Sequence, residues 1–303
     1  MSLRHVAFAL AFLLSPAGAP ASAQTAPDGI GTFRIGILAE AGSDSTVQGL
    51  AGLKKAYTLA LGIPVEFFVA EDYRTLIEAQ TERRIDYAVY SATAYATAEL
   101  ACGCVSALVA PTAASGAIGM RSVLVARPDG PKSVSDLAGF RIAIPGRGDI
   151  AGRELPLFSL GREGHALRGD EPFFVQVASQ AEAEDRLVAG EVDAMFGWIE
   201  TGIDRNPLPR DGTLARLAAS GGGSDGFHVV WTSELLRYGP HAISKDLDPE
   251  VRRRLIPFLT GLKDGEPDLF AALARHQQGG FVSVNDADYA TAVDLARFIS
   301  EAK

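Results

Sequence analysis

FRIGIL at Phe33–Leu38 is the first of three short β-rich runs, and PVEFFVA at Pro64–Ala70 and DYAVYS at Asp86–Ser91 are the next two. Helical segments separate these runs, because Thr46–Leu61 has a helical pattern and Asp72 is placed to cap a second helix. The order strand, helix, strand, helix, strand predicts a parallel sheet with right-handed crossovers. The fold class is therefore α/β.

The carboxyl ends of these strands are the expected place for a ligand, as in other open parallel sheets. They correspond to Ala39–Asp44, Ala70–Tyr73 and Tyr90–Tyr95. Tyr90 and Tyr95 stand where a ligand is expected, but aromatic side chains at strand ends also pack into cores. The sequence leaves both roles open for these two tyrosines.

The strand and helix alternation repeats after the β-rich run Ser122–Arg127. The Gly-rich connector Gly221–Gly226 then leads to another strand, Phe227–Trp231, and to three helical segments. We expect two α/β lobes, joined by the strands near 120–127 and 227–231, that form a hinged pair with a ligand cleft between them. The other predicted elements are strands at Phe140–Pro145, Pro172–Val177 and Val192–Trp198 and helices at Ala181–Ala189, Pro249–Leu262, Pro267–His276 and Asp286–Ile299.

The beginning of the chain is typical of a secretory signal peptide. Arg4 precedes the apolar run Val6–Leu14, and the small residues Ala21–Ala23 form a cleavage site. Nine apolar residues are too few to span a bilayer, and the residue directly after the cleavage site is not a Cys that could carry a lipid anchor. We expect export to the periplasm with cleavage near Ala23, followed by lobe I at 24–123 and 227–303 and lobe II at 124–226.

The composition bounds the class of partner. The 303 residues include 47% hydrophobic and 21% charged residues, which is enough apolar material for packed cores. The formal net charge is −9 and the pI is about 5.1, so nucleic acid and anionic membranes would repel the protein. No nucleic-acid partner is expected.

The two cysteines, Cys102 and Cys104, are separated by a single glycine in ACGCV. One interpretation is a redox pair or half of a metal site. The other is a strained local disulfide or two free thiols, and it is preferred because no His or further Cys lies nearby in the sequence.

The segment Gly146–Ala151 matches the G-x-G-x-x-G/A fingerprint of dinucleotide-binding proteins, and it follows a strand and enters a helix. Three observations disfavour that interpretation. Pro156 interrupts the helix early, and the acidic residues Asp170 and Glu171 precede the next predicted strand, whereas the ribose partner should end it. Export would also separate the protein from its cofactor pool. A helix N-terminus that points at the cleft, where its free N–H groups attract polar groups, explains the segment better.

A second motif and the histidines give no catalytic or metal signal. Gly222–Gly226 matches G-x-S-x-G, but glycines precede it and a strand follows, whereas a nucleophile elbow needs a strand before and a helix after. The histidines after the signal peptide lack metal-ligand spacing. No metal and no cofactor are expected.

Five blocks of the chain occur in a characteristic order: Asp72–Ala98, Ser133–Pro145, Ala151–Pro156, Leu187–Glu200 and Val229–Leu255. They resemble the phosphate/phosphite/phosphonate family of periplasmic substrate-binding proteins of ABC transporters, over roughly Phe33 to Ala292. The resemblance implies a two-lobed type II periplasmic binding protein fold with a ligand cleft between the lobes.

The resemblance also shows where this chain departs from the family. In phosphonate-binding members, a Ser-Thr-Ser-Gly turn at a helix N-terminus holds the phosphonate oxygens, and the matching positions here are Asp149, Ile150, Ala151 and Gly152. The three hydroxyls are missing. We expect Asp149 to cap the helix and to repel a dianion, because two unit charges ~4 Å apart repel by roughly 1 kcal/mol in water and by more in a partly dry cleft.

The resemblance implies roles for further residues. Gln180 stands at a family His and keeps its hydrogen-bonding capacity without a cation. Glu200 matches a carboxylate that faces the ammonium group in members that bind aminoalkylphosphonates, whereas a second such acid is lost at or near Gly239. Tyr90 matches the aromatic residue of the cleft. The whole predicted site comprises Tyr90, Ser91 and Thr93 in the first lobe and Gly148, Asp149, Ile150, Ala151, Gly152, Gln180 and Glu200 in the second.

Two arginines flank the altered turn. Arg147 and Arg153 either compensate for the charge of Asp149 or lie in solvent and pair with Glu154.

The predicted function is a solute-binding protein of an ABC transporter. It would close on a small polar ligand, either a phosphonate- or phosphate-like oxyanion or an amine-bearing analogue, and deliver it to a permease in the inner membrane. One alternative is a ligand-sensing subunit for a membrane histidine kinase. The other is an exported enzyme, which is disfavoured because no nucleophile, base and orienting group occur in a recognisable arrangement.

Overall fold

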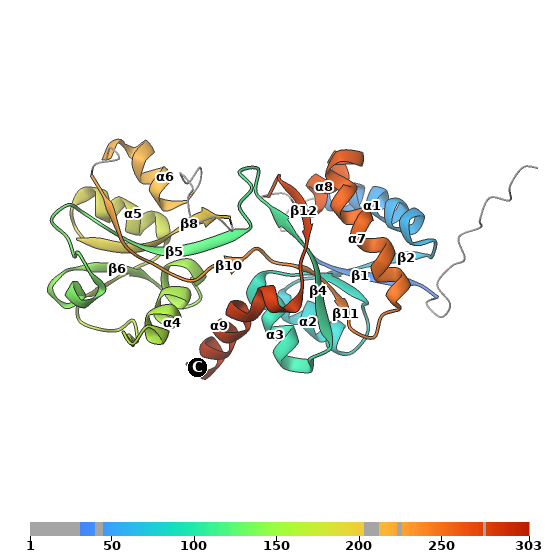
Figure 1. Ribbon diagram of the computed structural model, residues 1–303, viewed down its shortest axis with the longest axis horizontal. Helices are drawn as coiled ribbons and strands as arrows, with labels where there is room; N and C mark the ends of the chain where they lie inside the picture. Colours follow the sequence, from blue (N-terminus) through green and yellow to red (C-terminus); the bar gives the residue numbers. More distant parts are fainter. Residues whose placement is uncertain (1–30, 40–44, 203–211, 223–225, 275–276, 303) are drawn as a thin grey trace, which may run out of the picture.

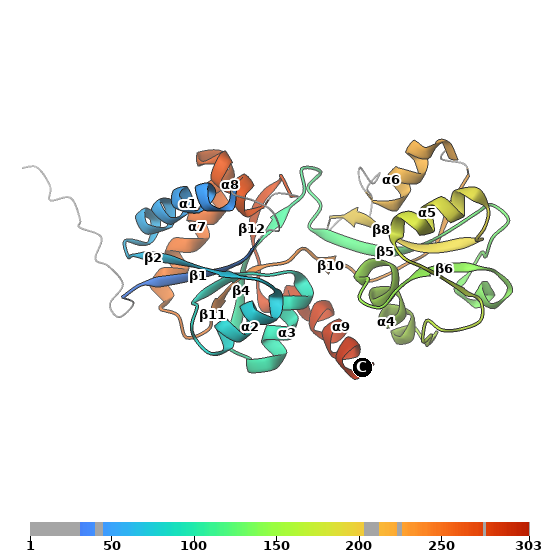
Figure 2. The same ribbon diagram turned by 180° about the vertical axis from the view of Figure 1, so that it is seen from behind.

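The computed structural model describes residues 31–39, 45–202, 212–222, 226–274 and 277–302. These residues form two six-stranded sheets, each with helices on both faces, as Figure 1 shows. Figure 2 gives the view from behind. The predicted signal peptide and most of the predicted loop Ala39–Asp44 lie outside the described residues, as do His276 and the centre of the Gly221–Gly226 connector. No helix in the described part of the chain is long and apolar enough to cross a membrane.

The first lobe contains the sheet β12-β4-β11-β3-β1-β2. Its β1 strand pairs in parallel with β2 and with β3, so the predicted strand, helix, strand order and parallel pairing are confirmed. Asp72 caps α2 as expected, since its carboxylate accepts a hydrogen bond from the Thr75 N–H at 2.7 Å. The elements are β1 (Phe33–Leu38), α1 (Ser45–Leu61), β2 (Val65–Ala70), α2 (Tyr73–Thr81), β3 (Tyr87–Val89), α3 (Ala92–Cys102), β4 (Val105–Thr112), β11 (His241–Ser244), α7 (Pro249–Gly265), α8 (Pro267–Leu273), β12 (Gly280–Ser283), the 3-10 turn η4 (Asp286–Tyr289) and α9 (Ala290–Glu301).

The second lobe contains the sheet β10-β5-β8-β6-β7, with β9 paired to β5. The predicted strands and the helix near 181–189 are confirmed, and the short capped helix near Ser133 is a 3-10 turn. The elements are β5 (Gly119–Ala126), η1 (Val134–Gly139), β6 (Ile142–Pro145), the π-helical turn η2 (Ile150–Glu154), α4 (Leu155–Arg162), β7 (Phe174–Val177), α5 (Gln180–Ala189), β8 (Ala194–Thr201), α6 (Thr213–Leu217), η3 (Ala218–Gly222), β9 (His228–Thr232) and β10 (Leu236–Arg237).

The chain passes between the sheets at residues 113–118 and 238–240, which we call the crossing segments. The strands expected to join the lobes, near 120–127 and 227–231, were wrongly assigned to that role, because both β5 and β9 lie wholly in the second sheet. We therefore propose lobe boundaries at the crossing segments in place of 123/124 and 226/227.

Helix α9 connects the two lobes in a second way. It packs against α3 in the first lobe and extends toward α4 in the second, as both views show (Figures 1 and 2). The rings of Phe298 and Phe158 lie 5.8 Å apart, and the Arg162 guanidinium lies 3.1 Å from the Asp294 carboxylate. The lobes therefore share an apolar and ionic contact besides the crossing segments.

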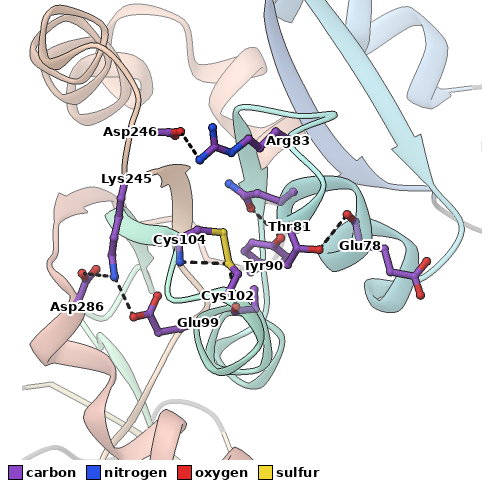
Figure 3. Close-up of a disulfide and its surroundings, with 12 residues drawn as sticks. Glu78, Thr81, Arg83, Tyr90, Glu99, Cys102, Cys104, Lys245, Asp246 and Asp286 are labelled. Carbon is purple, nitrogen blue, oxygen red and sulfur yellow. Dashed lines mark hydrogen bonds and ion pairs between the residues drawn. A yellow bond between two sulfur atoms is a disulfide. The ribbon is translucent and has the colours of Figure 1, made fainter.

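Cys102 and Cys104 form a disulfide at the end of α3, so the local disulfide is the alternative that the structure supports (Figure 3). Gly103 between them has a φ of +60°, which a glycine adopts readily. The Lys245 N–H donates to the Cys104 carbonyl at 2.8 Å, and the Lys245 ammonium lies 2.9 Å from the Glu99 carboxylate. The disulfide thus helps to fix the turn from α3 into β4.

The core of the first lobe contains a buried polar chain. The hydroxyls of Tyr57 and Tyr87 lie 3.2 Å apart, and the Tyr87 hydroxyl is hydrogen-bonded to Nδ1 of His241. All three residues are at most 1% exposed. Burial lowers the pKa of His241 to about 3, so this imidazole is neutral in the folded protein.

This neutral histidine makes the first lobe sensitive to acid. Below the unfolded pKa near 6.5, the unfolded chain binds a proton that the folded chain does not, so stability falls as the pH falls toward 3. The free energy of unfolding should lose about 1.4 kcal/mol per pH unit from this residue. Urea unfolding at pH 6.5 and 4.5 should show about 2.3 kcal/mol less acid loss in His241→Gln than in the wild type, because the unfolded histidine is already half protonated at pH 6.5.

The exposed His165 provides the control for that measurement. His165→Gln should lose as much stability on acidification as the wild type. Equal acid losses in His241→Gln and the wild type would show that His241 does not remain neutral in the fold.

Candidate functional site

The turn after β6 carries the altered family motif and supplies its own anion. The Asp149 carboxylate accepts a hydrogen bond from the Gly152 N–H at 2.7 Å, and the Glu154 carboxylate accepts one from the Gly148 N–H at 2.8 Å. Gly148 has a φ of +91°, which allows the turn. The expected capping by Asp149 is confirmed, and N–H groups that a bound oxyanion would need already have acceptors.

Gln180 lies against this turn from the start of α5. Its Nε2 donates to Asp149 Oδ1 at 3.3 Å. A Cβ at Gly152 would lie 1.8 Å from Gln180 Nε2 and 2.7 Å from the Pro145 Cγ, so a larger residue there would displace the Gln180 amide from Asp149. Gln180 Oε1 is buried and accepts no hydrogen bond from any described residue. It is an acceptor that lacks a donor.

Ile150 and Ala151 hold the turn in place. The Ser122 hydroxyl donates to the Ala151 carbonyl at 2.6 Å, which fixes the turn to β5. The Ile150 side chain packs against an apolar cluster that spans both lobes and includes Tyr90 of the first and Phe158 of the second. Both residues therefore position the site.

Glu200 lies on β8, beside both crossing segments. Its carboxylate accepts a hydrogen bond from the Tyr238 hydroxyl at 2.5 Å and one from the Ser115 hydroxyl at 3.4 Å. Both partners are neutral, and in the described part of the chain no basic nitrogen lies within 4 Å of the carboxylates of Glu200 or Asp149. The second-lobe side of the site is therefore negative and rich in acceptors.

Sequence reasoning missed Ser115 and Tyr238 as partners of Glu200. No local motif identifies them, because they become neighbours of β8 only through the crossing segments. They could be found only by knowing which strands belong to which sheet, because that places the crossing segments beside β8.

Ser91 and Thr93 begin helix α3 on the first-lobe side. The Ser91 hydroxyl accepts a hydrogen bond from the Ala94 N–H at 3.1 Å and lies 3.4 Å from the Thr93 hydroxyl. Both side chains are half-buried, and the first turn of a helix has N–H groups without intrahelical acceptors. This helix end offers donors and a positive dipole, with no acidic residue in its first turn.

Gly239 joins the two sides of the site. A Cβ there would lie 1.9 Å from the Tyr90 carbonyl oxygen and 2.7 Å from the Ser91 Cα. The crossing segment therefore packs directly on the backbone before α3 and has no room for a side chain. An acidic side chain at this position would therefore clash with the first-lobe backbone.

Tyr90 does not reach the site. Its ring is 3% exposed in the first-lobe core, and its hydroxyl donates to Gln80 Oε1 at 2.7 Å. Tyr95 is fully buried and its hydroxyl donates to Asp286 at 2.9 Å. Both tyrosines have core roles in this conformation, so we leave Tyr90 out of the site proposed below.

The two flanking arginines do not pair with Glu154 among the described residues. Arg147 donates to the Ala302 carbonyl at 3.0 Å. Arg153 is 7% exposed and donates only to uncharged oxygens. Arg147 is exposed, as one expectation stated, but neither guanidinium pairs with Asp149 or Glu154 among the described residues.

Comparison with solved structures identifies the fold. A binding-protein component of a Pseudomonas aeruginosa ABC phosphonate transporter is 18% identical, with 89% of this chain and 87% of that chain covered and a TM-score of 0.51. A Xanthomonas citri protein bound to ATP is 18% identical, with coverages of 90% and 98% and a TM-score of 0.59. PhnD1 of Prochlorococcus marinus in complex with methylphosphonate is 11% identical, with coverages of 89% and 99% and a TM-score of 0.52. The predicted two-lobed type II periplasmic binding protein fold is confirmed.

Comparison with sequences identifies the family. No curated protein matches the chain significantly. The family model described as "ABC transporter, phosphonate, periplasmic substrate-binding protein" matches residues 19–289, which is most of the chain. The chain therefore belongs to the family of periplasmic substrate-binding proteins of phosphonate ABC transporters.

Proposed function

We propose that this substrate-binding protein takes a small zwitterionic or amine-bearing ligand in preference to a phosphonate dianion. Family membership assigns it a small-molecule ligand, a membrane permease as partner and a periplasmic location. Because the family is one of transport proteins, membership favours a role in transport over a role as a sensor for a histidine kinase. Our proposal goes beyond family membership in one respect, which is the charge of the ligand groups that face each lobe.

The observation that carries the proposal is a pair of carboxylates without basic partners. Asp149 and Glu200 accept hydrogen bonds only from amide and hydroxyl groups among the described residues. Gln180 Oε1 beside Asp149 is a buried acceptor without a donor. An ammonium group supplies N–H donors and positive charge, whereas a phosphonate dianion would meet like charge at close range.

The first-lobe side has the opposite character. Ser91, Thr93 and the free N–H groups of the first turn of α3 are donors at the positive end of a helix. A zwitterion with its anionic end on α3 and its ammonium group toward Asp149, Gln180 and Glu200 would satisfy both sides. A ligand that touches both lobes at once would stabilise the closed form.

The first test changes the charge of the self-capping residue. Asp149→Asn keeps an acceptor for the Gly152 N–H and removes the negative charge. Calorimetry at pH 7 should show methylphosphonate binding at least fivefold tighter in Asp149→Asn than in the wild type, and 2-aminoethylphosphonate binding at least fivefold weaker, because about 1 kcal/mol of charge interaction is removed.

Asp136→Asn is the matched control, since Asp136 caps the exposed turn η1 in a similar way. It should leave both affinities unchanged. Submicromolar binding of methylphosphonate by the wild type would overturn the argument from Asp149.

The second test addresses Glu200. Glu200→Gln keeps an oxygen that can accept from Tyr238 and Ser115. It should weaken the binding of 2-aminoethylphosphonate about tenfold, because a hydrogen bond to a charged acceptor contributes roughly 1.4 kcal/mol more than one to a neutral acceptor. Binding of methylphosphonate should be equal or tighter. Glu66→Gln, on the exposed face of β2, controls for the change in net charge. An unchanged affinity for the aminophosphonate in Glu200→Gln would remove Glu200 from the site.

A further inference from the structure

A cavity of about 820 Å³ lies between the second lobe and the end of α9, and Arg153 and Glu154, which directly follow the turn described above, line it. Its walls come from η2 and α4, the loop 167–172, strand β7 and the end of α9. Its volume is within the range of small-molecule sites. None of the residues from Gly148 to Gly152, nor Gln180 nor Glu200, lines it.

Arg153 provides the charge in this cavity. Its side chain is buried, and NH1 donates to the Pro145 carbonyl at 3.1 Å and to Gln176 Oε1 at 3.3 Å, while NH2 donates to the Gly169 carbonyl at 3.2 Å. These acceptors are all uncharged, and in the described ranges no carboxylate oxygen lies within 4 Å of the guanidinium. A buried guanidinium without a counter-ion is unusual, because buried charges are normally paired.

The acidic residues that line the cavity have other partners. Glu154 accepts from the Gly148 N–H, and Glu171 accepts from the N–H groups of Arg168 and Gly169. The backbone hydrogen bonds lower the pKa of the Glu171 carboxyl against the effect of its desolvation. Asp170 lies 3.2 Å from the guanidinium of Arg168. The lining therefore leaves Arg153 as a cation without an acidic partner.

The remaining wall is apolar and is shared between the lobes. Leu157, Leu167 and Phe174 of the second lobe face the same cavity as Phe298 of α9. Arg147 closes this end by its bond to the Ala302 carbonyl. An occupant would therefore contact an aliphatic and aromatic surface on one side and a guanidinium on the other.

We propose that this cavity is a second ligand site, which takes a small organic monoanion with an apolar body, such as an arylalkyl carboxylate, with its carboxylate on Arg153. Of the five guanidinium N–H donors, three are used in the contacts above. The other two are without an acceptor in the described part of the chain, and a carboxylate oxygen would supply one. The ligand class differs from that of the Asp149 and Glu200 site, which is negative.

The test uses phenylacetate as the probe and phenylacetamide as its neutral counterpart. Calorimetry on the signal-free protein should show phenylacetate binding at least tenfold tighter than phenylacetamide, because only the anion pairs with Arg153. Arg153→Gln should weaken phenylacetate at least tenfold and leave phenylacetamide unchanged. Arg83→Gln, an exposed arginine paired with Asp246 in the first lobe, is the control and should change neither affinity.

A second variant keeps the proposal testable if Arg153→Gln fails to fold. Leu167→Trp places a larger side chain in the cavity from a half-buried loop position and should abolish phenylacetate binding with Arg153 intact. Asp149→Asn and Glu200→Gln should leave phenylacetate binding unchanged, which separates this site from the proposed transport ligand. Equal binding of acid and amide, or phenylacetate binding that survives Leu167→Trp, would overturn the proposal.

A crystal structure with phenylacetate gives an independent readout. Phenylacetate beside Arg153 supports the proposal, whereas phenylacetate found only beside α3, or binding at crystal concentration only, contradicts it.

Discussion

The hydrogen bond from the Gly152 N–H to the Asp149 carboxylate sets the chemistry of the whole site. A helix N-terminus behind a parallel strand is an anion site by default, because its N–H groups lack acceptors and its dipole is positive. Here a side chain of the same turn supplies that anion permanently. The fold of the family is kept, while this turn presents a carboxylate beside its N–H groups, and the proposed ligand preference rests on that carboxylate.

The same local arrangement explains why neighbouring positions tolerate little change. A side chain at Gly239 would clash with the backbone of Tyr90 and Ser91, and one at Gly152 would displace the Gln180 amide. Ile150 joins the turn to the apolar cluster that spans both lobes, and Ala151 joins it to β5 through Ser122. Close packing thus holds the proposed site, and Asp149, Gln180 and Glu200 are the groups that we propose to select the ligand.

Much of the fold could be predicted from periodicity, and part of the site could not. The strands at Phe33–Leu38 and Val65–Ala70 and the cap at Asp72 follow from local pattern, and so does the cap at Asp149. The antiparallel strands β11 and β12 were missed because they are short and pair only with distant segments. The burial of Tyr90 and the neutral partners of Arg153 depend on tertiary packing, and a sequence pattern does not encode which of several nearby acceptors a long side chain selects.

Helix α9 has a consequence for how the lobes move. It packs mainly against the first lobe, yet the Phe298 ring contacts the Phe158 ring of the second lobe and Asp294 forms an ion pair with Arg162 there. Rotation of one lobe against the other about the crossing segments would pull on these two contacts, which would then have to break or shift. Helix α9 is therefore a third link between the lobes, whose contacts any change in the angle between the lobes has to rearrange.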